Sequence, residues 1–251
     1  MWKILIDSPN GPSLRGGALS AHFSVGADTD MSEREHFFIT SPHLNVLKYP
    51  EDNTLAVYKS DALMLIFNTV RKILGSLNSI PKINLQYELE NGVYQEVYLR
   101  EEDPILHMEQ LLDPYYYEIN LPPQLRESNL SKLLDLTYTD RLFREVIVLY
   151  GLSLENHLYI LMNMYKISEY IEYDLKNIKK NGNTNVQALE EAMIPFRNNG
   201  HLRHFANTHA GSGLQSRHGL NNNRYDKEKP KIEEVYNKLH TIIVEWAKLK
   251  I

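Results

Sequence analysis

Cysteine is absent from this chain of 251 residues. Its absence excludes disulfide bonds, thiolate zinc sites and a cysteine nucleophile, and it fits a reducing compartment. No apolar run approaches the roughly 20 residues that a membrane-spanning helix requires. The short N-terminal run of Ile4, Leu5 and Ile6 is followed by Asp7, which is not the pattern of a signal peptide. We therefore expect a soluble, cytoplasmic protein without a membrane partner.

Acidic residues are missing from one long stretch. Residues 192–225, 34 positions in all, contain no Asp or Glu but hold four arginines and four of the ten histidines. The whole chain has a formal charge of −5, so this stretch carries +4 and the remainder −9. The balance excludes a chain-wide basic field for nucleic acid and predicts a local cationic patch on an acidic body.

Two common catalytic or nucleotide-binding motifs are also missing. Residues 11–17 are rich in glycine but do not end in the Gly-Lys-Ser/Thr of a phosphate-binding loop. Residues 211–213 read Gly-Ser-Gly and lack the Gly-x-Ser-x-Gly spacing of a serine hydrolase. The 16 tyrosines are scattered, which is typical of packing residues rather than a base-stacking surface.

The first 125 residues predict a mixed α and β domain. Short apolar or aromatic runs between turn residues indicate strands at 2–6, 35–39, 43–47 and 55–58. A 3.6-residue period predicts a helix over 60–77, with Ser60 as its N-cap. Alternation over 83–99 around Asn91-Gly92 predicts a hairpin with a type I′ turn. Residues 103–123 are expected to form a buried crossing segment that ends in a linker.

The second half predicts helices. Apolar periodicity places them at 130–136, 140–150, 153–179, 186–196 and 231–249, with Gly151 ending the second, Ser153 capping the third and the acid-free stretch forming a loop before the last. The fold class is therefore α+β: a mixed domain over 1–125, with a sensing or regulatory role, followed by an all-α bundle over 126–251. Residues 122–127 are the expected boundary.

The acid-free stretch is where chemistry is expected. Arginine binds phosphate oxygens through a planar fork, and histidine exchanges protons near neutral pH. Together they suit cleavage of a phosphodiester without a metal or other cofactor, and nearby carboxylates would weaken phosphate binding. A metal site made by His201, His204 and His209 is a competing idea, but no acid lies close in sequence. A plain surface loop is the other alternative.

The helical half resembles a known family. Its order is a long helix carrying Leu158-Tyr159 and residues 165–169 (Tyr-Lys-Ile-Ser-Glu), a shorter helix, the Arg/His stretch and a last helix with Trp246. This order is similar to HEPN (higher eukaryote and prokaryote nucleotide-binding) domains, and the resemblance covers about residues 126–251. HEPN domains are helical bundles, often dimeric, of bacterial toxins and antiviral defence systems, and many are metal-independent ribonucleases.

The HEPN signature is an arginine, usually followed by a polar residue, then four to six residues to a histidine. Arg197 to His204 satisfies it with six residues between, and Arg203 to His209 satisfies it with five. A third set, Ala206-Asn207, Ser212-Gly213 and residues 217–219 (Arg-His-Gly), resembles a bacterial HEPN-like subgroup. The resemblance implies a catalytic set drawn from Arg203, His204, His209, Arg217 and His218. It implies RNA or phosphate binding by Arg197, Asn207 and Arg224.

The resemblance leaves two functions open. One is a metal-independent ribonuclease of toxin or antiphage type, acting on RNA as a homodimer or within a hetero-complex. The other is a catalytically inactive HEPN-like subunit that binds RNA, nucleotide or protein. The inactive alternative arises because His218 has no arginine at the signature spacing before it, where Gly211, Ser212 and Gly213 stand. A third alternative is a helical protein unrelated to HEPN domains.

Overall fold

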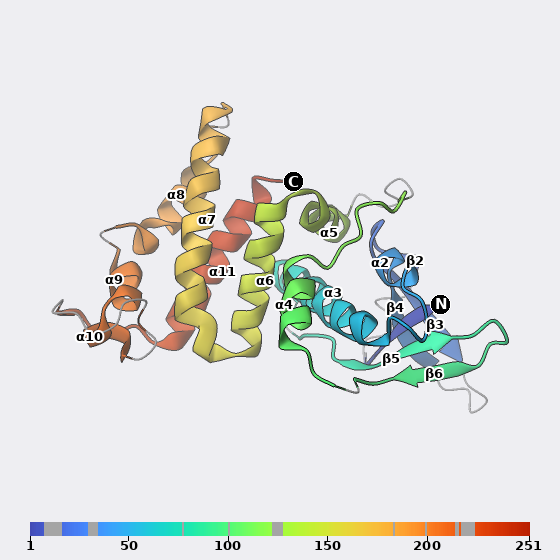
Figure 1. Ribbon diagram of the computed structural model, residues 1–251. Coiled ribbons are helices and arrows are strands. Elements are labelled where there is room, and N and C mark those ends of the chain that lie inside the picture. Colours follow the sequence, from blue (N-terminus) through green and yellow to red (C-terminus); the bar gives the residue numbers. More distant parts are fainter. Residues whose placement is uncertain are drawn as a thin grey trace. The chain divides into compact units, whose positions relative to one another are not determined.

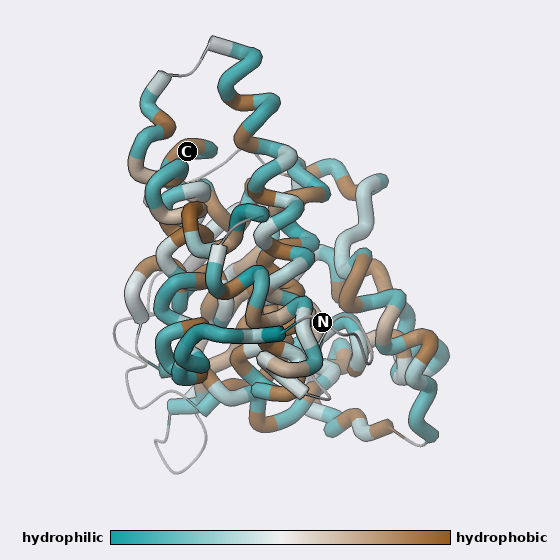
Figure 2. Tube along the Cα trace, turned by 90° about the vertical axis from the view of Figure 1, so that its left-hand side faces the viewer, coloured by the Kyte–Doolittle hydropathy of each residue, from teal (hydrophilic) through white to brown (hydrophobic). Residues whose placement is uncertain are grey.

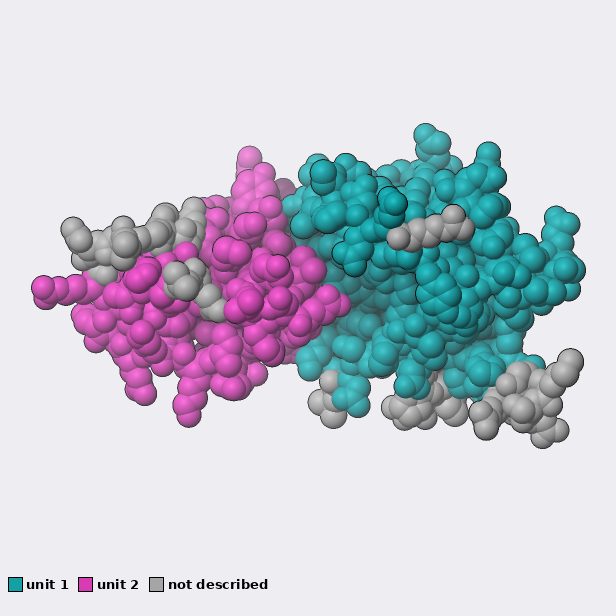
Figure 3. All heavy atoms as spheres, turned by 60° about the horizontal axis from the view of Figure 1, so that its bottom comes forward, with its two compact units in different colours: residues 1–148 teal, residues 149–251 magenta. Residues whose placement is uncertain are grey.

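The computed structural model describes residues 1–7, 17–29, 35–76, 78–99, 101–121, 128–182, 184–198, 200–213, 216 and 224–251. An N-terminal antiparallel sheet with a long helix precedes a largely helical C-terminal region, which confirms the α+β class (Figure 1). The chain divides into two compact units, Met1–Val148 (unit 1) and Leu149–Ile251 (unit 2) (Figure 3). This division falls inside α6 (Arg141–Glu155), whereas the boundary expected at 122–127 lies outside the described residues.

The sheet of unit 1 is antiparallel throughout. Its order is β2-β3-β4-β1-β5-β6. The strands are β1 (Trp2–Ile6), β2 (Gly17–Ala18), β3 (Ser24–Thr29), β4 (Glu35–Thr40), β5 (Lys82–Glu88) and β6 (Tyr94–Val97). Ile4 of β1 lies opposite Ile39 of β4 and Leu85 of β5, and all three side chains are buried. This row across three strands is part of the core of unit 1.

In its described residues, unit 1 also contains α2 (Pro42–Asn45), α3 (Asn53–Ile73), α4 (Pro104–Leu112), α5 (Asn129–Thr139) and the first part of α6, up to Val148. The long helix α3 packs against α4, α5 and the sheet, where Phe67 stacks on Phe23 with ring centroids 5.7 Å apart. The strands expected at 2–6 and 35–39 are confirmed. Those expected at 43–47 and 55–58 are wrong, because these residues belong to α2 and α3. A short continuous apolar run fits a buried helix as well as a strand.

The start of one helix and the turn of the hairpin differ from the prediction. The helix expected to start at Ser60 starts at Asn53, and Ser60 donates from inside it to the Val57 carbonyl. The hairpin is confirmed, but its turn is a three-residue loop rather than a type I′ turn. The Leu89 amide donates to Val93 O, the Gly92 amide donates to Leu89 O, and Gly92 has φ of 78°. A turn closed by glycine in the left-handed region gives this loop length.

The described residues of unit 2 begin with the end of α6. The elements that follow, in chain order, are η1 (His157–Tyr159), α7 (Ile160–Lys180), α8 (Gln187–Ala192), η2 (Ile194–Phe196), α9 (His201–Asn207), α10 (His209–Ser212) and α11 (Ile232–Lys248). The expected ends of α7 and of the last helix are confirmed; Gly182 after α7 has φ of 86°. Gly151 does not end a helix and Ser153 does not cap one, because both lie within α6.

The helices of unit 2 bury one face each. Brown and teal segments alternate along them in Figure 2, as amphipathic helices require. Helix α11 packs against α7 and α8. Its Trp246 is buried and donates from Nε1 to Asp174 of α7 at 2.7 Å, so the apolar ring has a partner for its one polar atom. Within the described residues, no helix combines the length and apolarity needed to cross a membrane.

Candidate functional site

The acid-free stretch is largely helical where the structure describes it. It includes η2, α9 and α10. The loop expected after Phe196 is therefore wrong for α9 and α10, whereas η2 lies within the helix expected at 186–196. Leu202, Phe205 and Ala206 are buried and hold α9 against the core of unit 2. Thr208 caps α10 by accepting from the Gly211 amide at 3.2 Å. Small buried side chains and one cap thus give this segment a defined shape.

Gly200 fixes where α9 begins. A Cβ atom at this position would lie 2.1 Å from the Pro195 carbonyl oxygen and 2.7 Å from that of Ile194. Both of these contacts are with backbone, which cannot move aside as a flexible side chain can. Only glycine therefore allows α9 to approach η2 this closely.

Arg203 is directed to α7. It donates to Tyr165 Oη at 2.7 Å, and its guanidinium lies 4.8 Å from the centre of the Tyr165 ring. Glu169 and Glu172 lie 3.7 and 3.9 Å from its nitrogen atoms, and the Arg203 side chain is 16% exposed. An aromatic ring and two carboxylates of α7 therefore partner this cation inside unit 2.

The partners of His204 differ from those of Arg203. Its Nε2 lies 3.1 Å from the Arg224 carbonyl oxygen, and its ring stacks on Tyr225 with centroids 5.4 Å apart. A carbonyl only accepts, so Nε2 carries the proton in this contact. Neighbouring residues of a helix project about 100° apart, which explains why Arg203 and His204 do not share a partner.

His209 lines a cavity of about 380 Å³ within unit 2. The polar residues at this cavity are His209, Ser212 and Lys229. Apolar side chains form the rest of its wall, with the smaller part made by glycines and a proline: Leu161, Phe205, Gly211, Gly213, Pro230, Ile232 and Val235. The combination is a cavity of mixed polar and apolar lining, with an imidazole and an ammonium group in its wall. We call it the His209 cavity.

Carboxylates from other elements reach the Arg/His segment. Arg197 lies 3.6 Å from Glu190 of α8, and His201 lies 3.4 Å from Glu234 of α11. Lys179 also binds Glu190, and this hydrogen bond is the main reason that the pKa of Glu190 lies below its usual value. The expectation of an acid-poor surrounding is therefore wrong for these residues. Folding supplies the carboxylates that the local sequence lacks.

The remaining predicted residues fall into two groups. Arg217 and His218 lie outside the described residues. Asn207 has its Oδ1 atom buried without a hydrogen-bond partner, and Arg224 contributes its carbonyl to His204. Within the described part of the chain, no hydrogen bond or ion pair joins Arg203 to His204 or to His209. No group of three His, Cys, Asp or Glu side chains in the same residues could hold a metal ion.

A second histidine cluster, not identified from the sequence, lies in unit 1. His22 and His43 are 2% and 0% exposed, and His22 Nδ1 lies 3.0 Å from His43 Nε2. Burial lowers the pKa of His22 to about 4. Burial, helped by the charges of His22 and Lys59, lowers that of His43 to about 3. These residues are 21 positions apart and follow no motif, so no spacing in the sequence could have indicated the pair.

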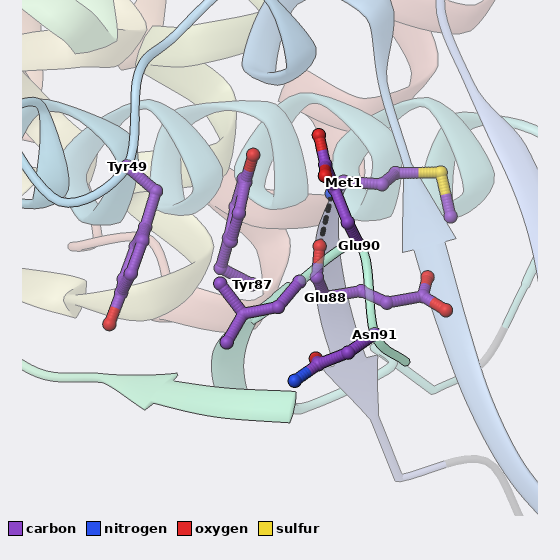
Figure 4. Close-up of a pocket in the computed structure, with 7 residues that line it drawn as sticks. Met1, Tyr49, Tyr87, Glu88, Glu90 and Asn91 are labelled. Carbon is purple, nitrogen blue, oxygen red and sulfur yellow. Dashed lines mark hydrogen bonds between the residues drawn. The ribbon is translucent and has the colours of Figure 1, made fainter. Parts of the chain in front are cut away.

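Unit 1 also has an open cavity of about 690 Å³ beside the hairpin (Figure 4). Tyr49 and Tyr87 stack there with ring centroids 4.7 Å apart. The Met1 amino group donates to the Glu88 carbonyl at 2.7 Å, and the Glu88 carboxylate lies 3.1 Å from Lys3. These aromatic and charged groups already have partners in unit 1, so the cavity offers a ligand few unpaired groups.

Comparison with known proteins gives no assignment: no family model, no curated protein and no solved structure matches this chain.

Proposed function

We propose that residues 149–251 form a HEPN-like module that binds RNA at the His209 cavity without cutting it, as a subunit of a defence complex. The observation that carries the proposal is the placement of Arg203. Its partners are Tyr165, Glu169 and Glu172, and His209 faces a separate cavity. The module therefore offers a binding recess but no arginine–histidine pair among its described residues.

The His209 cavity supports RNA as the ligand. Its wall includes Leu161, Phe205 and Val235, which suit the flat apolar surface of a nucleobase. Lys229 and His209 stand beside this wall, where a cation can contact the phosphate of the same nucleotide. A base site next to a phosphate site is the arrangement expected for a single-stranded nucleic acid.

The contacts of Arg203 argue against cleavage. Metal-free cleavage needs a proton acceptor at the 2′-hydroxyl and a cation at the phosphate, both within hydrogen-bonding reach of one phosphodiester. Arg203 is the signature cation for His209, and two glutamates lower its attraction for phosphate. Binding without turnover follows from this separation.

The test is a binding and a cleavage assay on the same labelled single-stranded RNA. The double variant His209→Ala/Lys229→Ala is expected to lose about tenfold or more in affinity, since it removes both cations that can contact the phosphate. Lys238→Ala, which removes an exposed lysine of α11, is the matched control and leaves affinity unchanged. Equal affinity of wild type and the double variant would refute the proposal.

A ribonuclease is the second candidate, and one observation favours it. His209 and Lys229 line one cavity, and an imidazole and an ammonium group can serve as proton acceptor and phosphate ligand. In that case wild type fragments the RNA, arrests growth on expression, and loses both effects when His204, His209 and His218 are replaced by alanine. Intact RNA at saturating protein supports the non-cleaving module instead.

A further inference from the structure

The segment after α4 forms a strap across unit 1. We define the strap as residues 113–117. Lys59 of α3 donates to the Pro114 carbonyl at 2.8 Å, and Tyr115 Oη lies 2.6 Å from Thr137 Oγ1 of α5. The Tyr116 amide donates to His43 Nδ1 at 3.0 Å. The strap is thus tied to α2, α3 and α5 by these hydrogen bonds. Further contacts add to them: Asp113 lies 3.7 Å from Arg144 of α6, and Lys59 lies 4.8 Å from the centre of the Tyr116 ring.

The contact with His43 belongs to a chain of hydrogen bonds that runs in one direction. The Tyr116 amide can only donate, so His43 Nδ1 accepts and the proton of His43 lies on Nε2. That proton is donated to His22 Nδ1 at 3.0 Å, which places the proton of His22 on its own Nε2. His22 Nε2 then faces Asp135 Oδ1 at 3.5 Å. A fixed backbone donor at one end determines both tautomers.

This chain of hydrogen bonds cannot take up a further proton without losing one of its contacts. A proton added to His43 would sit on Nδ1 and point at the Tyr116 N–H. A proton added to His22 would sit on Nδ1 and point at the His43 Nε2–H. In each case two donors face each other, and a buried hydrogen bond becomes a repulsive contact.

The charged groups around the pair come from several elements. Lys59 of α3 and Arg144 of α6 are cations, whereas Asp113 of the strap and Asp135 of α5 are anions. Lys59 opposes a charge on His43, and Asp135 favours one on His22. The uncharged rings packed around the pair are Tyr115, Tyr117 and Tyr138. Asp135 is the only one of the named anions placed to compensate a proton on the pair.

We propose that the His22–His43 pair is an acid-sensitive latch, which holds the strap while both rings are neutral and releases it when they take up protons. The released strap exposes the buried Tyr115 ring and no longer contacts α2. Acid therefore changes the surface of unit 1 without a change in its sheet.

Linkage gives the size of the effect. In the closed state the pKa values of His22 and His43 are about 4 and about 3. In the released state both return to about 6.5, so release takes up two protons as the pH falls below 6.5. Between pH 7 and pH 5 the released population then rises about 500-fold. Burial raises the pKa of Asp135, which opposes part of this rise.

The test follows the Tyr116 amide and the two histidines in the full chain by NMR. With ¹⁵N-labelled histidine at pH 7, both rings are expected to be neutral with the proton on Nε2, and a coupling across the hydrogen bond joins His43 Nε2 to His22 Nδ1. The hydrogen-exchange protection factor of Tyr116, corrected for intrinsic rate, is expected to fall about 500-fold from pH 7 to pH 5. A protection factor that is unchanged, or a missing coupling, overturns the latch.

A matched pair of variants separates the latch from general acid effects. In His22→Asn the amide oxygen occupies the position of Nδ1 and still accepts from His43, but it does not titrate. With one titrating group left, the loss of protection is expected to shrink to about 20-fold. His36→Asn removes an exposed histidine of the same unit and keeps the full 500-fold effect. If His22→Asn loses as much protection as His36→Asn does, the pair is not the latch. If the His22→Asn variant does not fold, the couplings and exchange rates of the wild-type protein still test the proposal.

Discussion

Two histidines of unit 1 contact each other, whereas the two candidate histidines of unit 2 have separate surroundings. His22 and His43 are far apart in sequence, yet they meet in unit 1 at 3.0 Å and are buried there. His204 and His209 are close in sequence, yet in unit 2 one stacks on Tyr225 and the other faces a cavity. Proximity along the chain therefore does not predict which histidines contact each other. Packing, and not spacing, decides which titratable groups act on each other.

The largest effect that would test this comparison is the response of each unit to acid. Both buried histidines have a pKa lowered by folding, so they stabilise unit 1 fully above about pH 6.5 and lose that contribution as the pH falls toward their folded values of about 4 and about 3. From pH 7 to pH 5 unit 1 is expected to lose about 4 kcal/mol more in wild type than in His22→Asn/His43→Asn.

Hydrogen exchange read by mass spectrometry on the full chain measures this loss, because peptides from each unit are followed separately. The peptides of unit 2 in the same samples are the internal reference. An identical acid response of wild type and the double variant in unit 1 would contradict the assignment.

The next effect compares one histidine from each unit. His43→Leu leaves the Tyr116 amide and His22 Nδ1 without partners, which is expected to cost unit 1 about 2 kcal/mol at pH 7. His204→Leu removes a partly exposed ring and is expected to change unit 2 by less than about 0.5 kcal/mol. His43→Asn keeps an acceptor for Tyr116 and should recover part of the loss. Urea unfolding with the same exchange readout measures all three, and equal losses in the two units would remove the contrast.

A smaller effect concerns the carboxylates beside Arg203. Glu169→Gln/Glu172→Gln removes two negative charges while keeping the size of the side chains. Each partly exposed pair contributes about 0.2–1 kcal/mol, so RNA affinity is expected to rise about threefold to tenfold. The gain should shrink at high salt, because screening weakens the attraction. Fluorescence anisotropy at two salt concentrations measures it, with the exposed pair Glu102→Gln/Glu109→Gln of unit 1 as the charge-matched control.

The smallest effect is expected at Asn207. The resemblance implies RNA binding by this residue, but its Oδ1 atom is buried and has no partner. Asn207→Ala is therefore expected to change RNA affinity less than about twofold, because a buried oxygen does not reach a ligand. A tenfold loss with an unchanged thermal midpoint would return Asn207 to the binding site.

Much of the fold follows from local patterns. The sequence pattern alone predicts the strands at 2–6 and 35–39, the hairpin and the long helices α7 and α11. The errors occur where the pattern is ambiguous. Residues 55–58 are a continuous apolar run, a pattern that occurs both in buried helices and in strands. In the structure these residues are helical, because α3 already begins at Asn53. Gly151 lies inside α6 because packing tolerates a glycine there at modest cost.

The site could be predicted only in part. Arg203 and His209 are visible in the sequence because arginine and histidine are conspicuous in a stretch without acids. Tyr165, Glu169 and Glu172 are not, since they lie more than 30 positions before Arg203 on another helix. The contacts that neutralise Arg203 depend on the way α7 packs against α9, which no local spacing encodes. The same holds for the His22–His43 pair.

Gly200 has a consequence for genetics. Any side chain there collides with the backbone of η2, so the start of α9 must shift, and α9 carries Arg203, His204 and the approach to His209. One codon, far from any ligand atom, therefore controls the orientation of the whole segment. In an unbiased screen for loss of function, substitutions of Gly200 should recur alongside those of the residues that line the His209 cavity, although Gly200 itself does not line it.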